Sequence, residues 1–294
     1  MMPISPGAPL WMAARVILAD RGDDLFQRWE CVRITFGLEE IHDLRVSSRR
    51  LREGLALFSP CFPARNLRRI RSQVKVLTAI LGTMRNTDEA LLFFTPLPAL
   101  VPERAADVVQ QLIDQLQQER TIEQKSLKRR LKELDPTALR KVFVATCDQP
   151  RIFAAADNLC IAIADYLREK ITKRELAVQE LLPSARQEEN ITAQHRLRIA
   201  VKHLRYRCEM VAPLVGADLP PLLATLKQYQ EMLGKMHDLD VFAGMIVKRD
   251  GGTGITEPVC TIIAERRQAL FREFEKLLGH QPLATVSTRV RSLL

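Results

Sequence analysis

A basic amphipathic helix is predicted by the stretch Ile41-His42-Asp43-Leu44-Arg45-Val46-Ser47-Ser48-Arg49-Arg50-Leu51-Arg52. On a helix that turns by about 100° per residue, the cationic side chains fall on one narrow stripe, which comprises His42, Arg45, Arg49 and Arg52. An apolar stripe lies beside it and comprises Leu44, Leu51, Leu55 and Phe58. No carboxylate shares the cationic stripe. This helix can therefore bury one seam and present a row of cations next to it.

The same pattern returns later in the chain, each matching residue lying 153 positions after its counterpart. The second copy reads His195-Arg196-Leu197-Arg198-Ile199-Ala200-Val201-Lys202-His203-Leu204-Arg205-Tyr206. Its cationic row is His195, Arg198, Lys202 and Arg205. A further pair of motifs follows at an offset of 152, Leu81-Gly82-Thr83-Met84-Arg85-Asn86-Thr87-Asp88 and Leu233-Gly234-Lys235-Met236-His237-Asp238-Leu239-Asp240. Two paired motifs in the same order predict an internal duplication.

The composition favours packed helices and a polyanionic partner. Hydrophobic residues make up 47% of the 294 residues but aromatic residues only 5%, and no segment alternates with the period of two that strands need. The formal net charge is +9, so nucleic acid, inorganic polyphosphate and an anionic membrane surface all suit the chain as partners. We predict an all-α protein of two tandem four-helix bundles related by internal duplication.

Proline and glycine positions divide the chain into expected elements. Residues 1–9 read as a loose tail, residues 10–280 as the helical domain with halves 10–150 and 151–280, and residues 281–294 as a second tail. The expected helical stretches are 10–36 with a break at Gly22, 39–58, 66–94 with an interruption near Gly82, 103–134, 136–150, 152–182, 188–215, 222–247 and 256–278.

Targeting and redox features point to the cytoplasm. The six cysteines are scattered without a Cys-x-x-Cys pair, which is typical of reduced and mostly buried thiols. The first ten residues are rich in proline and lack the pattern of a signal peptide. The longest apolar stretch, residues 91–101, is too short for a membrane span and contains two prolines.

The two cationic rows are the candidate site. Guanidinium groups bind phosphate oxygens through paired N–H donors, and a lysine adds a point charge. Successive helical turns space such side chains about 5 Å apart, which suits consecutive phosphates. A solvated face is the usual alternative for a single basic helix, but these rows border the apolar seam and occur twice. Lys75 and Lys227, which share the 152-residue offset, are added to the predicted site.

Histidines and carboxylates near the rows have two interpretations each. His42 follows Glu39 in the Glu-x-x-His spacing of di-iron bundles, but Thr192 stands at the matching place before His195. We therefore predict no metal and no cofactor, and expect the histidines to donate to phosphate. The nearby carboxylates are expected to orient arginines through ion pairs, with general-base catalysis as the alternative; they are Asp88, Asp238 and Asp240.

These residues make the chain resemble the conserved histidine α-helical domain family, known as CHAD. The hallmark His-x-x-Arg-x-x-x-Arg-Arg-Leu-Arg is matched by residues 42–52, with a second copy at 195–205. The family's Leu-Gly-x-x-Arg/Asn-Asp-x-Asp-Val motif is matched by residues 233–241, whereas Asn86 stands where the first copy would usually have aspartate. The resemblance extends over roughly residues 10–280.

The resemblance implies two four-helix bundles related by a pseudo-twofold axis, with a basic groove or pore between them. It also implies binding of inorganic polyphosphate and, in some members, association with polyphosphate granules. Some members carry a triphosphate-tunnel catalytic domain with a Glu-x-Glu-x-Lys signature, which this sequence lacks. By position, the binding residues would be His42, Arg45, Arg49, Arg50, Arg52, His195, Arg198, Lys202, Arg205 and Tyr206.

We therefore expect a non-catalytic module that binds polyphosphate or another phosphate-rich polyanion. A nucleic-acid-binding protein is the first alternative, although the rows lack interleaved aromatic residues for base stacking. A metal-dependent phosphohydrolase that uses Asp88, Asp238 and Asp240 is the second, although the sequence shows no clustered ligand set.

Overall fold

The described part of the protein is built from helices. A computed structural model describes residues 4–151, 159–215 and 218–294, and within these ranges no β-strand occurs, only one isolated bridge between Pro9 and Ala162. None of the described helices is long and apolar enough to cross a membrane. The all-helical prediction is confirmed for the described residues.

Six α-helices occur among the described residues of the first half. They are α1 (Leu10–Thr35), α2 (Leu38–Leu57), α3 (Ala64–Ile80), α4 (Thr83–Phe94), α5 (Glu103–Glu133) and α6 (Pro136–Cys147), with 3-10 turns at Ser59–Cys61 and Leu97–Leu100. The second half contributes α7 (Ile163–Ala185), α8 (Ile191–Glu209), α9 (Ala212–Val215), α10 (Leu219–Asp250), α11 (Glu257–His280) and α12 (Leu283–Ser292). The first seven residues of the predicted helix 152–182 lie outside the described residues.

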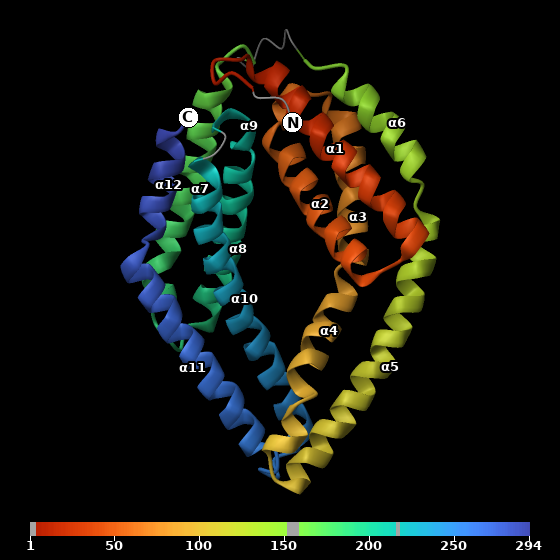
Figure 1. Ribbon diagram of the computed structural model, residues 1–294, viewed down its shortest axis with the longest axis vertical. Coiled ribbons are helices and arrows are strands. Elements are labelled where there is room, and N and C mark those ends of the chain that lie inside the picture. The colour runs from red at the N-terminus through yellow and green to blue at the C-terminus, as the bar shows by residue number, and fades with distance from the viewer. Residues whose placement is uncertain (1–3, 152–158, 216–217) are drawn as a thin grey trace.

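The helices form an elongated ring (Figure 1). On one side α2 packs between α1 and α3, and on the other α8 packs between α7 and α10, while α2 also contacts α8. At the far end α4 and α5 meet α10 and α11. The larger of two hydrophobic cores draws on both halves, and so does the smaller core at the far end. The cores therefore do not follow the predicted boundary between two separate bundles.

Two predicted helix breaks have different outcomes. At Gly22 the helix continues without a turn. The glycine instead permits close packing, because a Cβ there would lie only 2.1 Å from the ring of Phe143 on α6. Near Gly82 the chain does break between α3 and α4. The corresponding stretch of the second half is the continuous helix α10, since Gly234 lies inside it.

Both predicted tails are wrong where the structure describes them. Residues 281–294 contain α12, which packs on α7 and α10 through Leu283, Val286 and Val290. Residues 4–9 are held by backbone hydrogen bonds to distant segments: Ile163 N–H donates to Ala8 O, and Ile4 N–H donates to Pro213 O. These hydrogen bonds join residues 4–9 to the second half of the chain.

Candidate functional site

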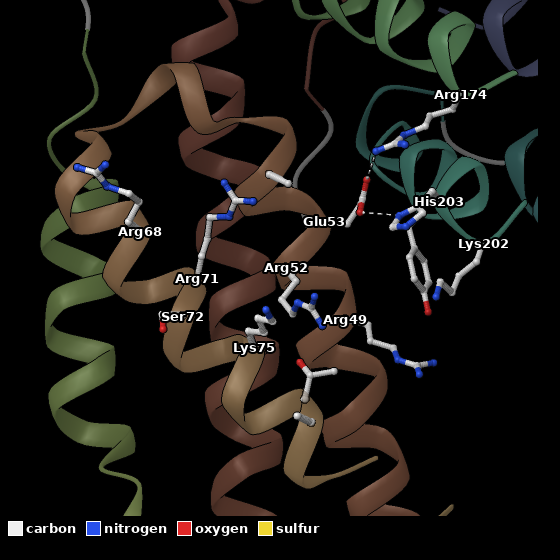
Figure 2. A pocket seen from close by; sticks show the side chains of 14 residues that line it. Arg49, Arg52, Glu53, Arg68, Arg71, Ser72, Lys75, Arg174, Lys202 and His203 are labelled. Carbon is white, nitrogen blue, oxygen red and sulfur yellow. Dashed lines mark hydrogen bonds and ion pairs between the residues drawn. The ribbon is translucent and has the colours of Figure 1, made fainter. Parts of the chain in front are cut away.

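The site forms where the two predicted basic helices, α2 and α8, face each other. Their apolar seams are fully buried, as the exposed fraction of Leu44, Leu51, Leu197 and Leu204 is 0%. Beside this seam lies a cavity of about 820 Å³ that is walled by α2, α3, α7 and α8. Cationic side chains from these helices extend into it (Figure 2). The two rows therefore converge on one space.

Three cations of the predicted rows line the cavity directly. Arg49 and Arg52 reach it from α2 and Lys202 from α8, with Arg49 extending toward Lys202 (Figure 2). Arg45 and Arg198 lie within electrostatic range of the same group, and Arg45 is 7% exposed. We call these five side chains, Arg45, Arg49, Arg52, Arg198 and Lys202, the cation cluster.

Burial and mutual repulsion disfavour the charged forms within the cation cluster. Burial and the guanidinium groups of Arg49 and Arg198 lower the pKa of Lys202 to about 8. Burial and the neighbouring Arg49 lower the pKa of Arg45 to about 10. Burial also lowers the pKa of Arg52 and of Arg198. The attraction of Asp238 for Arg198 and of Glu53 for Arg52 therefore does not outweigh burial and the repulsion between the cations.

Across the described parts of the chain, no member of the cation cluster forms an ion pair with a carboxylate. The Nε atom of Arg45 is buried and has no hydrogen-bond partner among the described residues. Unpaired buried charge is costly in a folded protein. An arrangement of this kind suits a ligand that brings negative charge.

Two buried glutamates, which sequence reasoning missed, pair with other cations at the α2–α8 contact. Glu53 of α2 lies 2.6 Å from Arg207 and 3.2 Å from His203 of α8. It also lies 3.9 Å from Arg174 of α7, the pair drawn at one end of the cavity in Figure 2. The basic partners lower the pKa of Glu53 against the opposing effect of burial. Glu53 therefore joins α2 to the second half.

The second of these glutamates, Glu209, engages two arginines that were predicted to bind phosphate. Arg50 Nε donates to Glu209 at 2.9 Å, and Arg205 donates to the same carboxylate at 2.7 Å. Arg205 also donates to Gln230 of α10 at 3.0 Å. Donors of Arg50 and Arg205 are therefore already committed within the protein, so they serve the contact between helices.

The remaining predicted cations and Tyr206 occupy varied positions. Lys75 of α3 lines the cavity, whereas Lys227 of α10 is exposed, does not line it and pairs with Glu231 at 3.5 Å. Tyr206 lines the cavity but is only 4% exposed, and the guanidinium of Arg205 lies 4.8 Å from its ring. His42 is exposed.

His195 contacts a second histidine that lies in the paired Leu-Gly motif. Its Nδ1 is 3.2 Å from Nδ1 of His237, and the two rings are 4.3 Å apart. Burial lowers the pKa of both, and nearby Arg198 lowers them further. Burial and the positive charge of Arg198 therefore both disfavour protonation of the pair. Among the described residues no group of three or more His, Cys, Asp or Glu could hold a metal ion.

The three predicted acidic residues have different surroundings. Asp88 pairs with Arg120 of α5 and Asp240 with Arg267 of α11, both at 2.5 Å, so they orient arginines of the outer helices rather than the cationic rows. Burial raises the pKa of Asp238, while the positive charges of Arg198 and Arg85 oppose this shift.

Further cations of the cavity come from outside the predicted rows. Arg68 and Arg71 of α3 and Arg174 of α7 line it with Lys75 (Figure 2). The i, i+3 and i+7 spacing of Arg68, Arg71 and Lys75 places them on one face of α3. That spacing is visible in the sequence, but only the packing of α3 beside α2 shows which way the face points.

Comparisons with known proteins agree with this architecture. A model of the CHAD domain family matches residues 16–247. The crystal structure of the CHAD domain from the plant Ricinus communis shares 22% sequence identity, with a TM-score of 0.62 over 100% of this chain and 95% of its own. PptA from Streptomyces chartreusis shares 15% identity, with a TM-score of 0.68 over 92% of this chain and 100% of its own. No curated protein sequence matches the chain.

Proposed function

Because the chain belongs to the CHAD domain family, we propose that it binds inorganic polyphosphate in the cavity between α2, α3 and α8. The cation cluster is the observation that carries this proposal. Its five side chains converge from two helices, and none of them forms an ion pair with a carboxylate among the described residues. A polyanion would neutralise them and so relieve their repulsion.

A flexible chain of phosphates suits the chemistry of the cluster. Each arginine guanidinium donates paired N–H hydrogen bonds to phosphate oxygens, and Lys202 adds a compact charge opposite Arg49. A duplex or a structured nucleic acid is less suited, because Tyr206 is the one Phe, Tyr or Trp side chain among the described lining residues and is buried. Base stacking therefore has little exposed surface in the cavity.

We propose that binding occurs without turnover of the polymer. Asp88 and Asp240, two of the three carboxylates considered for catalysis, are each engaged by an arginine of an outer helix, and the third, Asp238, lies within electrostatic range of Arg198 and Arg85. Incubation with polyphosphate and Mg²⁺ or Mn²⁺ tests this point, since release of orthophosphate would contradict it. We also propose that the protein acts in the cytoplasm and binds there to polyphosphate granules.

We further propose that the two cationic rows arose by internal duplication of a helical unit. Residues 153 positions apart share burial, since Leu44 and Leu197, and likewise Leu51 and Leu204, are all 0% exposed. Asp88 and Asp240 lie 152 positions apart, and each pairs with an arginine of the next long helix, α5 or α11. The helix orders α1–α2–α3/α4–α5–α6 and α7–α8–α10–α11–α12 also correspond.

A titration of labelled long-chain polyphosphate tests the proposed function. The double variant Arg49→Glu/Lys202→Glu should weaken binding by at least roughly 100-fold, since each reversal places a negative charge in the cluster. The matched control is Arg104→Glu/Lys248→Glu, which makes the same change in charge at exposed positions of α5 and α10.

The control should change affinity by less than about twofold, because exposed charges far from the ligand are screened. Affinity of the wild-type protein should fall steeply with salt, with a slope set by the number of phosphates neutralised. An equal affinity for polyphosphate and for a mononucleotide would refute the proposal. Preference for single-stranded DNA in direct competition would favour the nucleic-acid alternative.

A further inference from the structure

We propose that bound polyphosphate leaves the α2–α8 seam on one side only, across α3, and that Arg68 and Arg71 are part of its path. This inference rests on the proposed function and names further binding residues for it. The argument compares α3 with the corresponding part of α10. The two segments have a common register, since Val74 and Leu77 of α3 and Leu226 and Tyr229 of α10, 152 positions later, are all 0% exposed.

The face of α3 toward the cavity is cationic and unpaired. Arg68, Arg71 and Lys75 line the cavity with Ser72 and Thr78, and the three cations are exposed to solvent. In the part of the chain that the structure describes, none of the three forms an ion pair. A phosphate chain that enters the cation cluster therefore meets further positive charge along α3 (Figure 2).

The matching face of α10 is not cationic. The positions 152 residues after Arg68 and Arg71 are Pro220 and Leu223. Lys227 matches Lys75, but its ammonium group pairs with Glu231, which stands where the first half has Ala79. The one cation of this face is thus partly neutralised by a carboxylate one turn away.

One difference between α2 and α8 distinguishes the α3 side of the seam from the α10 side. Ala56 of α2 lines the cavity, and its methyl group leaves room beside Arg52. The matching residue of α8 is Glu209, which is 5% exposed and holds Arg205, the counterpart of Arg52. On the α10 side the side chain of Glu209 thus occupies the position that is left open by the small side chain of Ala56 on the α3 side.

Charge reversals at matched positions of the full-length protein test this one-sided path. With labelled polyphosphate, Arg71→Glu and Lys75→Glu should each weaken binding by roughly tenfold. Arg69→Glu, on the same helix but outside the cavity lining, and Lys227→Glu should change it by less than about twofold. The log–log salt dependence should become shallower by about one for each α3 phosphate contact that is lost.

The variant Ala56→Glu provides an independent test, because it copies Glu209 into the open side and should weaken binding by at least roughly tenfold. Far-ultraviolet circular dichroism and thermal unfolding confirm that each variant is folded. Equal losses for Lys75→Glu and Lys227→Glu, or for Arg71→Glu and Arg69→Glu, would overturn the one-sided path while binding through the cation cluster stands. Absence of polyphosphate binding by the wild-type protein would overturn both proposals.

Discussion

The lowered pKa of Lys202 makes a quantitative prediction about pH. Burial and the surrounding arginines lower this pKa from 10.5 to about 8 in the free protein. Bound phosphates would offset the repulsion from Arg49 and Arg198, and so raise the pKa again toward its ordinary value. Polyphosphate binding should therefore be accompanied by proton uptake at Lys202, and affinity should fall as pH rises through about 8.

The size of the effect follows from the protonated fraction of the free lysine. With a pKa of about 8, nearly all of the side chain is charged at about pH 7 and about one part in eleven at about pH 9. If only the charged form binds tightly, affinity falls about tenfold over this range, which corresponds to about 1.4 kcal/mol. Arg45 contributes little below about pH 9, because its pKa is about 10.

Isothermal titration calorimetry in buffers of different ionisation enthalpy measures both the affinity and the proton uptake. The matched control is Lys202→Arg, which keeps the charge but does not titrate in this range, so its affinity should stay nearly constant from about pH 7 to about pH 9. A wild-type affinity that is independent of pH over this range would refute the reasoning. A tenfold loss that persists in Lys202→Arg would assign the titration to another group.

Two further predictions concern stability, and urea unfolding measures both. Glu53→Gln leaves the buried guanidinium of Arg207 without its carboxylate and should lower the free energy of unfolding by about 3 kcal/mol. The pKa of Glu53 is lowered below its ordinary value of 4.5, so the stability that this carboxylate contributes should be lost as the wild-type protein is acidified below that value. Gly22→Ala should destabilise the protein by about 1–3 kcal/mol, because the added methyl group clashes with Phe143. The control Gly244→Ala, in open space on α10, should stabilise the protein by about 0.5–1 kcal/mol. Destabilisation by both substitutions would contradict this packing argument.

Local patterns in the sequence were sufficient to predict most helices and the cavity-facing cations of α2. The apolar positions Leu44 and Leu51 repeat at helical spacing, so burial of the seam sets the direction of Arg49 and Arg52 beside it. Helix α12 was missed because its segment is short and lies after a long helix, so only contacts with α7 and α10 reveal its role.

The parts of the site that were missed depend on contacts between distant segments. In the sequence Arg50 and Arg205 look as available for a ligand as Arg49. In the structure both donate hydrogen bonds to Glu209, which lies 159 residues after Arg50. No periodicity predicts which carboxylate a given arginine meets. In the same way, Arg71 resembles any solvated arginine until the packing of α3 places it in the cavity wall.

The attachment of residues 4–9 to the second half has a consequence for synthesis of the chain. The carbonyl of Pro213, which receives the amide hydrogen bond of Ile4, is made 209 residues later. At bacterial or eukaryotic elongation speeds, roughly 10–40 s pass before that partner exists. For most of this interval Leu10 and Trp11 also lack their backbone acceptors, because Ile161 and Leu159 are made only shortly before Pro213. The N-terminal end of α1 therefore lacks these hydrogen-bond partners, and its apolar side chains stay accessible to chaperones, until translation is well advanced.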